Sequence, residues 1–577
     1  MKRCPQCNRV ETDEGLVYCR VDGAALVSES SVADDANTKE FGSSAVSSEI
    51  ATSILPHRTD AKIKHATAPT TVLSAQQPPA TTQPLSKQSR RTFILASVTL
   101  GLAVIVVVGY FNFWRKSEAV IQSIAVLPFA NPSKDPNTDY LSDGIPENII
   151  NSLSQLPHLK VMSRNSAFHY KGKDVDVQTV AKDLQVQAVL TGRVEQRGDS
   201  LTISVELINA QDNSQIWGQQ YNRKLADVFV VQSEIAREIS DKLRLKLNTT
   251  EQQQIARRPT DNLKAFQFYI QGRTLAARRT REDLLNAMDL YEKAIAEDGN
   301  YALAYTGLAD AYANLGVRSY MDPSDGRRKA DDAARKALAL DQNLAEAHFA
   351  VSQAKVLFAP YDLPLAKREL EHALELSPSL AMAHQYLGIL FAVNGQLDQS
   401  LGEYSKAREL DPFSASIARG AAFPYYLRRD YPRSLEMLQR ANQLGPPFSV
   451  FWEVQVYTMS GRYEEALAEL SRARQTRKVD EVLTFSEGLI YAAQGKRTEA
   501  LRVVKELEQI TAQGAGQAQY LARIHVALGN KDEAIVWLQK GLETGALTGF
   551  YPDDPIWDPI RGDQRFGDLV QRSAVKF

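Results

Sequence analysis

Cysteine is scarce in this sequence, and its placement is informative. Only three cysteines occur in 577 residues, and all three lie within the first 19. An odd number of cysteines in one short segment argues against a disulfide framework, and this grouping is typical of metal binding in a reducing compartment. The rest of the chain is free of cysteine and therefore suits either side of a membrane.

Motifs of catalysis are also missing. The eight histidines are scattered along the chain, which contains no HExxH, GxSxG or GxxxxGK[ST] sequence. We therefore expect a protein that is not an enzyme and has no small-molecule substrate. An unrecognised site within residues 121–247 is the enzymatic alternative that stays open.

An excess of charge of either sign is absent as well. The chain has 67 Lys and Arg against 69 Asp and Glu, which gives a formal net charge of −2. Nucleic-acid binding depends on a basic surface, and no basic patch is evident along the chain. We expect no nucleic-acid partner.

Residues 1–27 have the ligand spacing of a zinc ribbon in which one thiolate is replaced by a carboxylate. The pattern C-x2-C-x11-C-x2-D is formed by Cys4, Cys7, Cys19 and Asp22. Zinc accepts thiolate and carboxylate ligands in a tetrahedral set, although thiolate-rich sites favour Cys or His as the fourth ligand. Zinc held by Asp22, zinc completed by water or by a partner's ligand, and a remnant without metal are the three alternatives.

The sequence has one long hydrophobic run, and a polar stretch precedes it. Residues 28–91 are rich in Ser, Thr, Ala, Pro and Gln and predict a disordered linker. Residues 92–114 contain no charged residue, and as a helix of about 35 Å they would cross a hydrocarbon core of about 30 Å. They predict one transmembrane helix, with a buried core helix as the alternative.

Charge does not decide the orientation of this predicted span. Three basic residues lie close to it on each side: Lys87, Arg90 and Arg91 before it, and Arg115, Lys116 and Lys134 after it. A thiolate site survives best in a reducing cytosol. We therefore predict a single-pass protein of the cytoplasmic (inner) membrane, with the N-terminus cytoplasmic and the C-terminal domains extracytoplasmic.

Residues 121–250 alternate between strand and helix patterns. Apolar strands are expected at 121–130 and 159–164, and helical spacing spans 139–157. A meander follows, in which the apolar alternation of a half-buried strand is formed by Leu201, Ile203, Val205 and Leu207. The pattern predicts a small α+β domain.

This segment also resembles a known family. The stretches SIAVLPFAN, YLSDGIPENIINSLSQL and QAVLTGRVEQRGDSLTISVELINA are similar to the TolB amino-terminal-like domain of bacterial multidomain signalling proteins. In that group the domain usually follows a transmembrane helix and precedes tetratricopeptide repeats, while a cyclase, kinase or winged-helix domain lies across the membrane. The resemblance implies a bacterial membrane-anchored signalling protein but no catalysis by the domain itself. This chain departs from the pattern because its front end holds only the cysteine segment.

Residues 262–577 carry a helical repeat. Glycines recur every 34 residues at Gly461, Gly495 and Gly529, and prolines do so at Pro378, Pro412 and Pro446. This period, with small residues at helix crossings, is the signature of tetratricopeptide repeats. We expect about eight units that form an all-α superhelix, with a C-terminal cap at residues 551–571.

The first helix of each unit should line a concave groove that binds protein partners. The groove residues expected from two central units are Met382, Gln385, Ile389, Arg419, Phe423 and Tyr426. Aromatic side chains in such a groove would anchor an apolar peptide. The alternative is that Phe423 and Tyr426 pack against a neighbouring helix.

Together these features predict a multidomain fold class: a small zinc-ribbon-like N-terminus, one transmembrane helix, an α+β TolB amino-terminal-like domain and an all-α tetratricopeptide superhelix. The predicted function is that of a non-enzymatic, membrane-anchored interaction scaffold or signalling protein. The alternative is a membrane-bound one-component transcription regulator whose N-terminal module contacts DNA or polymerase.

Overall fold

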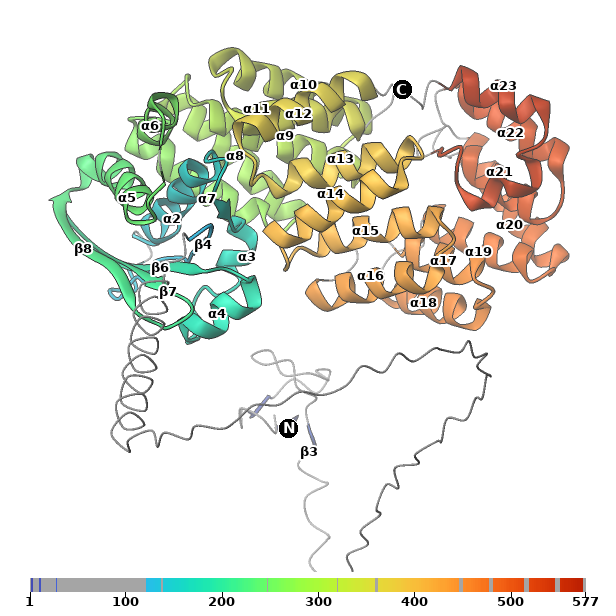
Figure 1. The fold of residues 1–577 in the computed structure, drawn as a ribbon. Coiled ribbons are helices and arrows are strands. Elements are labelled where there is room, and N and C mark those ends of the chain that lie inside the picture. Colours follow the sequence, from blue (N-terminus) through green and yellow to red (C-terminus); the bar gives the residue numbers. More distant parts are fainter. Residues whose placement is uncertain are drawn as a thin grey trace, which may run out of the picture. The chain divides into compact units, whose positions relative to one another are not determined.

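The computed structural model describes residues 121–573, apart from 136–137, 246, 319, 358–361, 446–449, 477–480, 513–517 and 545–549, together with residues 2–3, 10–11 and 27–28. The chain divides into two compact units, Met1–Val104 and Ile105–Phe577. Figure 1 labels the helices and strands of the second unit along its course.

The described part of the first unit is a small antiparallel sheet. Its strands are β1 (Lys2–Arg3), β2 (Val10–Glu11) and β3 (Val27–Ser28), in the order β2-β1-β3. Arg3 lies opposite both Val10 and Val27. The predicted metal ligands, Cys4, Cys7, Cys19 and Asp22, lie outside the described residues.

The predicted membrane span requires a correction. A crossing helix needs about 20 consecutive, mostly apolar residues. Among the described residues no helix is both long enough and apolar enough, and the predicted span at 92–114 lies outside them. The fold class that included one transmembrane helix and the single-pass membrane localisation are therefore wrong as predicted, and neither is carried further.

The second unit begins with a five-stranded mixed sheet in the order β5-β4-β6-β7-β8. Strand β4 runs parallel to β5 and β6, and the β6-β7 and β7-β8 pairs are antiparallel. The strands are β4 (Ser123–Val126), β5 (Lys160–Val161), β6 (Ala188–Arg197), β7 (Ser200–Asn209) and β8 (Gln215–Lys224). The accompanying helices are α2 (Asp139–Ser154), α3 (Arg164–Phe168), α4 (Val177–Leu184), α5 (Val228–Lys242) and α6 (Thr249–Ala256).

Helices cover both faces of this sheet because its strands alternate between two cores. Ile124 and Val126 of β4 pack in the cluster that contains α2 and α5, whereas Ala125 packs in the cluster that contains α4. The alternating apolar residues expected in the meander lie in β7 and are no more than 1% exposed. The period of two therefore predicted the buried face of this strand.

Eight helical hairpins follow within the described residues, and they form the tetratricopeptide array (Figure 1). The first four are α7 (Leu263–Ala276) with α8 (Arg281–Glu297), α9 (Ala302–Val317) with α10 (Pro323–Leu340), α11 (Ala345–Val356) with α12 (Leu363–Leu376), and α13 (Ala381–Val393) with α14 (Leu397–Leu410). The others are α15 (Ala415–Leu427) with α16 (Tyr431–Leu444), α17 (Phe451–Met459) with α18 (Tyr463–Thr476), α19 (Glu481–Ala493) with α20 (Arg497–Ala512), and α21 (Ala518–Ala527) with α22 (Lys531–Glu543). The short helix η3 (Pro555–Ile560) and α23 (Gln564–Arg572) end the array.

Two turns between hairpins form hydrogen bonds with the sheet domain. The hydroxyl of Ser379, in the turn after α12, accepts a hydrogen bond of 3.1 Å from the backbone N–H of Val161 in edge strand β5. In the turn after α14, the buried Asp411 carboxylate accepts a hydrogen bond of 2.5 Å from the Ser166 hydroxyl. Burial raises the pKa of Asp411. Because a sheet edge with unpaired backbone groups invites unwanted pairing, these turns also protect β5.

A buried carboxylate joins α2 to the first hairpin. Glu147 is 1% exposed and receives Arg164 at 2.6 Å and Arg273 of α7 at 3.0 Å. Burial raises the pKa of Glu147, but the two guanidinium groups outweigh it and hold that pKa below its usual value. The sheet and the array are therefore linked by ionic as well as apolar contacts.

The close approach of the two helices in a hairpin can be tested by substitution at Gly388. A Cβ at Gly388 in α13 would lie 2.8 Å from the ring of Tyr404 in α14, whereas a Cβ at Gly402 in α14 would meet nothing within 4 Å. We expect Gly388→Ala to lower the free energy of unfolding in urea by about 1–3 kcal/mol. Gly402→Ala should raise it by about 0.5–1 kcal/mol because alanine favours the helix. Equal stability of the two variants would contradict this account of the hairpin.

Candidate functional site

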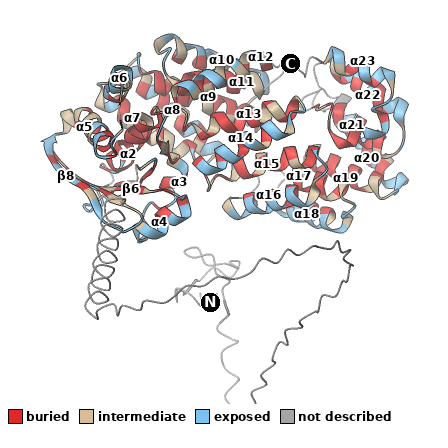
Figure 2. Cartoon of the chain, viewed as in Figure 1, coloured by how far each residue is buried: buried red, intermediate tan, exposed pale blue. Residues whose placement is uncertain are grey.

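The first helix of each hairpin is more buried than the second. In α13 ten of the 13 residues are buried, whereas α14 buries only Ser400, Tyr404, Ala407 and Leu410. Figure 2 shows the same contrast between α15 and its partner α16. The first helices therefore face the inside of the array, as the repeat pattern indicates.

Of the six expected groove residues, two form side-chain hydrogen bonds and two are partly buried against apolar side chains. Gln385 donates a hydrogen bond of 3.0 Å to the Ser416 hydroxyl, and Arg419 donates one of 2.9 Å to Asn442. Met382 and Ile389 are partly buried against apolar clusters of the array.

A buried carboxylate lies next to Arg419. Glu453 of α17 is 3% exposed, and its carboxylate lies 3.9 Å from the guanidinium of Arg419. Burial raises the pKa of Glu453, and Arg419 offsets only part of that rise. The wall of the array therefore holds a carboxyl group that is protonated more readily than an exposed one.

Phe423 and Tyr426 are covered by residues from two directions. The Trp452 ring lies 5.0 Å from Phe423 and 5.7 Å from Tyr426, measured between centroids. On another side the Tyr551 ring lies 4.8 Å from Phe423. Their exposed fractions are 7% and 0%, so these two rings are already packed within the chain.

Residues 550–563, which we name the C-terminal strut, contribute much of this cover. The strut follows the last hairpin, yet it contacts α15, which lies about 130 residues earlier: Tyr426 and Asp554, in hydrogen-bond contact, are 128 residues apart. Asp558 of the strut accepts a hydrogen bond of 2.7 Å from Arg429. A Cβ at Gly395 would lie 2.9 Å from the Asp553 carboxylate. The strut therefore connects the end of the array to its middle.

A buried ion pair fixes the strut. The Arg523 guanidinium of α21 lies 2.8 Å from the Asp554 carboxylate, and their side chains are 1% and 0% exposed. The Tyr426 hydroxyl donates a hydrogen bond of 2.5 Å to Asp554, and the Ile556 backbone N–H donates one of 3.0 Å. Arg523 also lies over the ring of Trp557, 5.2 Å from its centroid. These contacts offset part of the cost of removing both charges from water. Within the described residues, Arg523 Nε and Nη1 are buried without a hydrogen-bond partner.

Tyr426 is neutral in this environment. Burial raises the pKa of Tyr426 well above its ordinary value, and the Asp554 charge adds to the rise. Gln455 donates a hydrogen bond of 2.7 Å to its hydroxyl oxygen. The tyrosine therefore accepts from α17 and donates to the strut, which orients all three segments.

The sequence offered only a weak sign of this ion pair. Arg523 stands within the apolar stretch YLARIHVAL, and a charge on an apolar helix face requires a partner. Nothing in the period of the repeat identifies Asp554 as that partner, because the pairing depends on how the whole array curves.

Comparisons with known proteins match two parts of the chain. Residues 120–256 match the family described as HilA/YgeH-like transcriptional regulator, second domain. This match does not test the resemblance to the TolB amino-terminal-like domain, which stays a prediction.

The curated relative "Putative adenylate cyclase 3" of Rhizobium meliloti (strain 1021) is 34% identical over 200 residues. That match covers 35% of this chain and 33% of the relative, so the chain matches about a third of that protein's length.

Among solved structures, the tetratricopeptide protein YrrB is 24% identical and covers 32% of this chain and 87% of its own, with a TM-score of 0.22. Human IFIT1 is 14% identical to this chain. The match covers 56% of this chain and 78% of the IFIT1 chain, with a TM-score of 0.34. The matched solved structures thus include tetratricopeptide proteins, but these scores support no inference about ligands.

The buried ion pair predicts a large effect from a small change. Asp554→Asn would leave the Arg523 charge buried without its counter-ion, and we expect the free energy of unfolding to fall by about 3–5 kcal/mol. Asp558→Asn is the matched control in the same strut, since the Asp558 side chain is 42% exposed and its pair should contribute at most about 1 kcal/mol. Denaturant unfolding of both variants measures the difference, and equal losses would contradict a role for burial.

Proposed function

We propose that this chain is a non-enzymatic scaffold whose repeat array binds an extended segment of a protein partner. The array consists of helical hairpins whose first helices face inward, and such surfaces suit extended peptides. The curated cyclase relative is matched over only a third of its length, so no cyclase activity is transferred to this chain.

One observation carries the proposal: the inner helices of this array already hold a short segment of the chain, the C-terminal strut, which contains the helix η3. They do so with an aromatic contact between Tyr551 and Phe423, an exposed ion pair between Asp558 and Arg429, and the buried pair of Arg523 with Asp554. Aromatic anchors and arginine–carboxylate pairs are the contacts that dominate protein interfaces. We infer that a partner segment is bound by the same chemistry.

The surface available to a partner lies on α13 and α15, next to the strut. Met382, Ile389 and Arg419 are partly exposed, and Ser416 is exposed. Phe423 and Tyr426 are covered by Trp452 and the strut, so these two side chains are not themselves accessible to a partner. A partner would therefore meet a wall with two apolar side chains and one guanidinium group.

Photo-crosslinking tests this surface directly. A photoreactive phenylalanine analogue at Met382 or Ile389 in the full chain should capture a defined protein in the native cell, whereas the analogue at the exposed Glu464 of α18 should not. We expect Arg419→Ala to reduce the capture at Met382 about threefold to fivefold, since a partly exposed arginine–carboxylate contact contributes up to about 1 kcal/mol. Identical capture from all three positions, or capture that Arg419→Ala does not change, would contradict the proposal.

A second candidate function is transcription regulation, favoured by the match of residues 120–256 to a domain of HilA/YgeH-like transcriptional regulators. In this reading the N-terminal unit contacts DNA or polymerase. The described residues of this unit are the strand pairs Lys2–Arg3 with Val10–Glu11 and with Val27–Ser28. The ligand spacing of Cys4, Cys7, Cys19 and Asp22 in the sequence supports zinc as the group that would fix the conformation of this segment.

Metal analysis of the purified full chain tests the zinc site. We expect one zinc per chain by mass spectrometry, its loss in Cys7→Ser, and weaker retention against a chelator in Asp22→Ala, because a carboxylate is a weaker ligand for zinc than a thiolate in such a set. A chain without zinc would exclude the site. Chromatin pulldown with the same proteins separates the two functions, since a scaffold should recover no DNA.

A further inference from the structure

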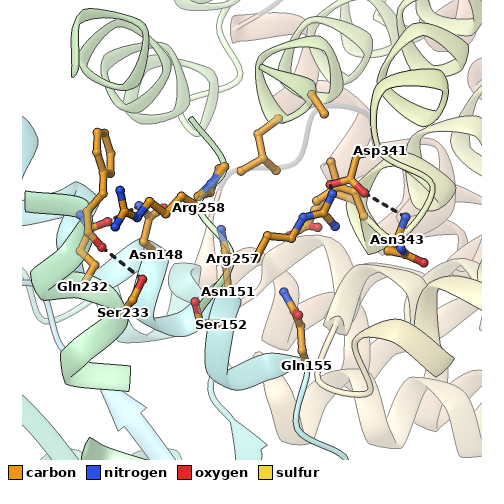
Figure 3. Close-up of a pocket in the computed structure, with 16 residues that line it drawn as sticks. Asn148, Asn151, Ser152, Gln155, Gln232, Ser233, Arg257, Arg258, Asp341 and Asn343 are labelled. Atoms are coloured by element: carbon orange, nitrogen blue, oxygen red, sulfur yellow. Dashed lines mark hydrogen bonds and ion pairs between the residues drawn. The ribbon is translucent and has the colours of Figure 1, made fainter. Parts of the chain in front are cut away.

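A polar cavity lies where the sheet domain meets the first hairpins. It has a volume of about 70 Å³ and is lined by α2, α5, residues 257–259 and the beginnings of α9 and α11. Figure 3 shows that polar side chains from these segments surround it. The cavity is separate from the groove described above, which lies on later hairpins.

Two buried amides form one wall of the cavity. Asn148 of α2 and Gln232 of α5 are 6% and 5% exposed, and the Asn148 Nδ2 donates a hydrogen bond of 2.7 Å to the Gln232 Oε1. Within the described residues the other amide atoms, Asn148 Oδ1 and Gln232 Nε2, are buried without a hydrogen-bond partner. Buried polar atoms are nearly always paired, and leaving one unpaired costs about 1–3 kcal/mol.

The pair therefore presents one free acceptor and one free donor to the cavity. Reversing both amides exchanges the roles of the two residues but preserves one donor and one acceptor. A primary carboxamide complements this arrangement, because its N–H groups and its carbonyl lie at the same end of the molecule. A hydrocarbon group would leave both protein atoms unpaired.

Two neighbouring guanidinium groups add positive charge at the edge of the cavity. Arg257 lies 2.7 Å from Asp341, and Arg258 lies 3.1 Å from Asp261. Each guanidinium has five N–H donors, so both retain donors beyond these pairs. Figure 3 shows that Arg258 extends toward Asn148 and Gln232, whereas Arg257 extends toward Asp341.

The acidic lining opposes an anion only weakly. Asp341 is paired with Arg257, and burial raises the pKa of Glu346, the other carboxyl group of the lining. A ligand anion would therefore compete for the Arg258 charge mainly with Asp261, whose side chain is 80% exposed. Its place would be at the mouth, because the Arg258 side chain is 43% exposed.

We propose that this cavity binds a small carboxylate that also bears a primary carboxamide. The carboxamide pairs with Asn148 and Gln232, and the carboxylate pairs with Arg258. The volume fits this division, since an enclosed cavity of about 150 Å³ holds benzene and about 70 Å³ encloses only the amide end. The site is independent of the proposed partner groove.

The test uses succinamate, the monoamide of succinate, as the probe on the full chain. Saturation-transfer NMR should detect its binding with a dissociation constant on the order of 1 mM. N,N-dimethylsuccinamate lacks the N–H donors and should bind about tenfold more weakly. Succinamide lacks the charge and should bind about threefold to fivefold more weakly. The buried amides are tested through the probe because their substitution would disturb the core.

A matched pair of surface variants tests the charge. Arg258→Gln should weaken succinamate binding about threefold to fivefold. Arg472→Gln, which removes an exposed arginine of α18 paired with Glu469, should leave it unchanged. Absence of succinamate binding at about 20 mM, equal binding of the dimethyl analogue, or equal binding by Arg258→Gln would each overturn the proposal.

Discussion

The carboxylate of Asp554 organises the C-terminal half of the second unit. It is completely buried and is shared by Arg523 of α21, Tyr426 of α15 and the backbone of the strut itself. A charge in this position is tolerated only if all its partners are in place. The curvature that brings α15 and α21 to the same carboxylate is therefore a requirement for burying the strut, and the aromatic contacts around Phe423 and Trp557 follow from it.

The sheet end of the unit is held by a comparable arrangement. The turns that carry Ser379 and Asp411 hydrogen-bond to β5 and α3, and Glu147 joins α2 to α7. Movement of the sheet relative to the first four hairpins would break these buried polar contacts together. The sheet and the first hairpins are thus connected by buried polar contacts as well as by a shared apolar core.

Local patterns predicted much of the fold, and long-range pairings were out of their reach. The 34-residue period predicted the helical hairpins, and the small residues expected at helix crossings include Gly388, which lies close to Tyr404. Both features depend only on neighbouring segments of the chain. The cover over Phe423 and Tyr426 was not predictable, since it comes from a strut some 130 residues away, with Tyr426 and Asp554 separated by 128 residues.

The most direct test of the account asks whether the strut reaches the middle of the array in solution. Arg429→Cys and Asp558→Cys, combined in a chain whose Cys4, Cys7 and Cys19 are replaced by Ser, place two thiols at the exposed ion pair that joins the turn after α15 to the strut. A short bismaleimide should convert nearly all of the folded chain to one intramolecular product, and Asp554→Asn should reduce that yield. Only uncrosslinked or intermolecular products would contradict the closure of the array by its own C-terminal strut.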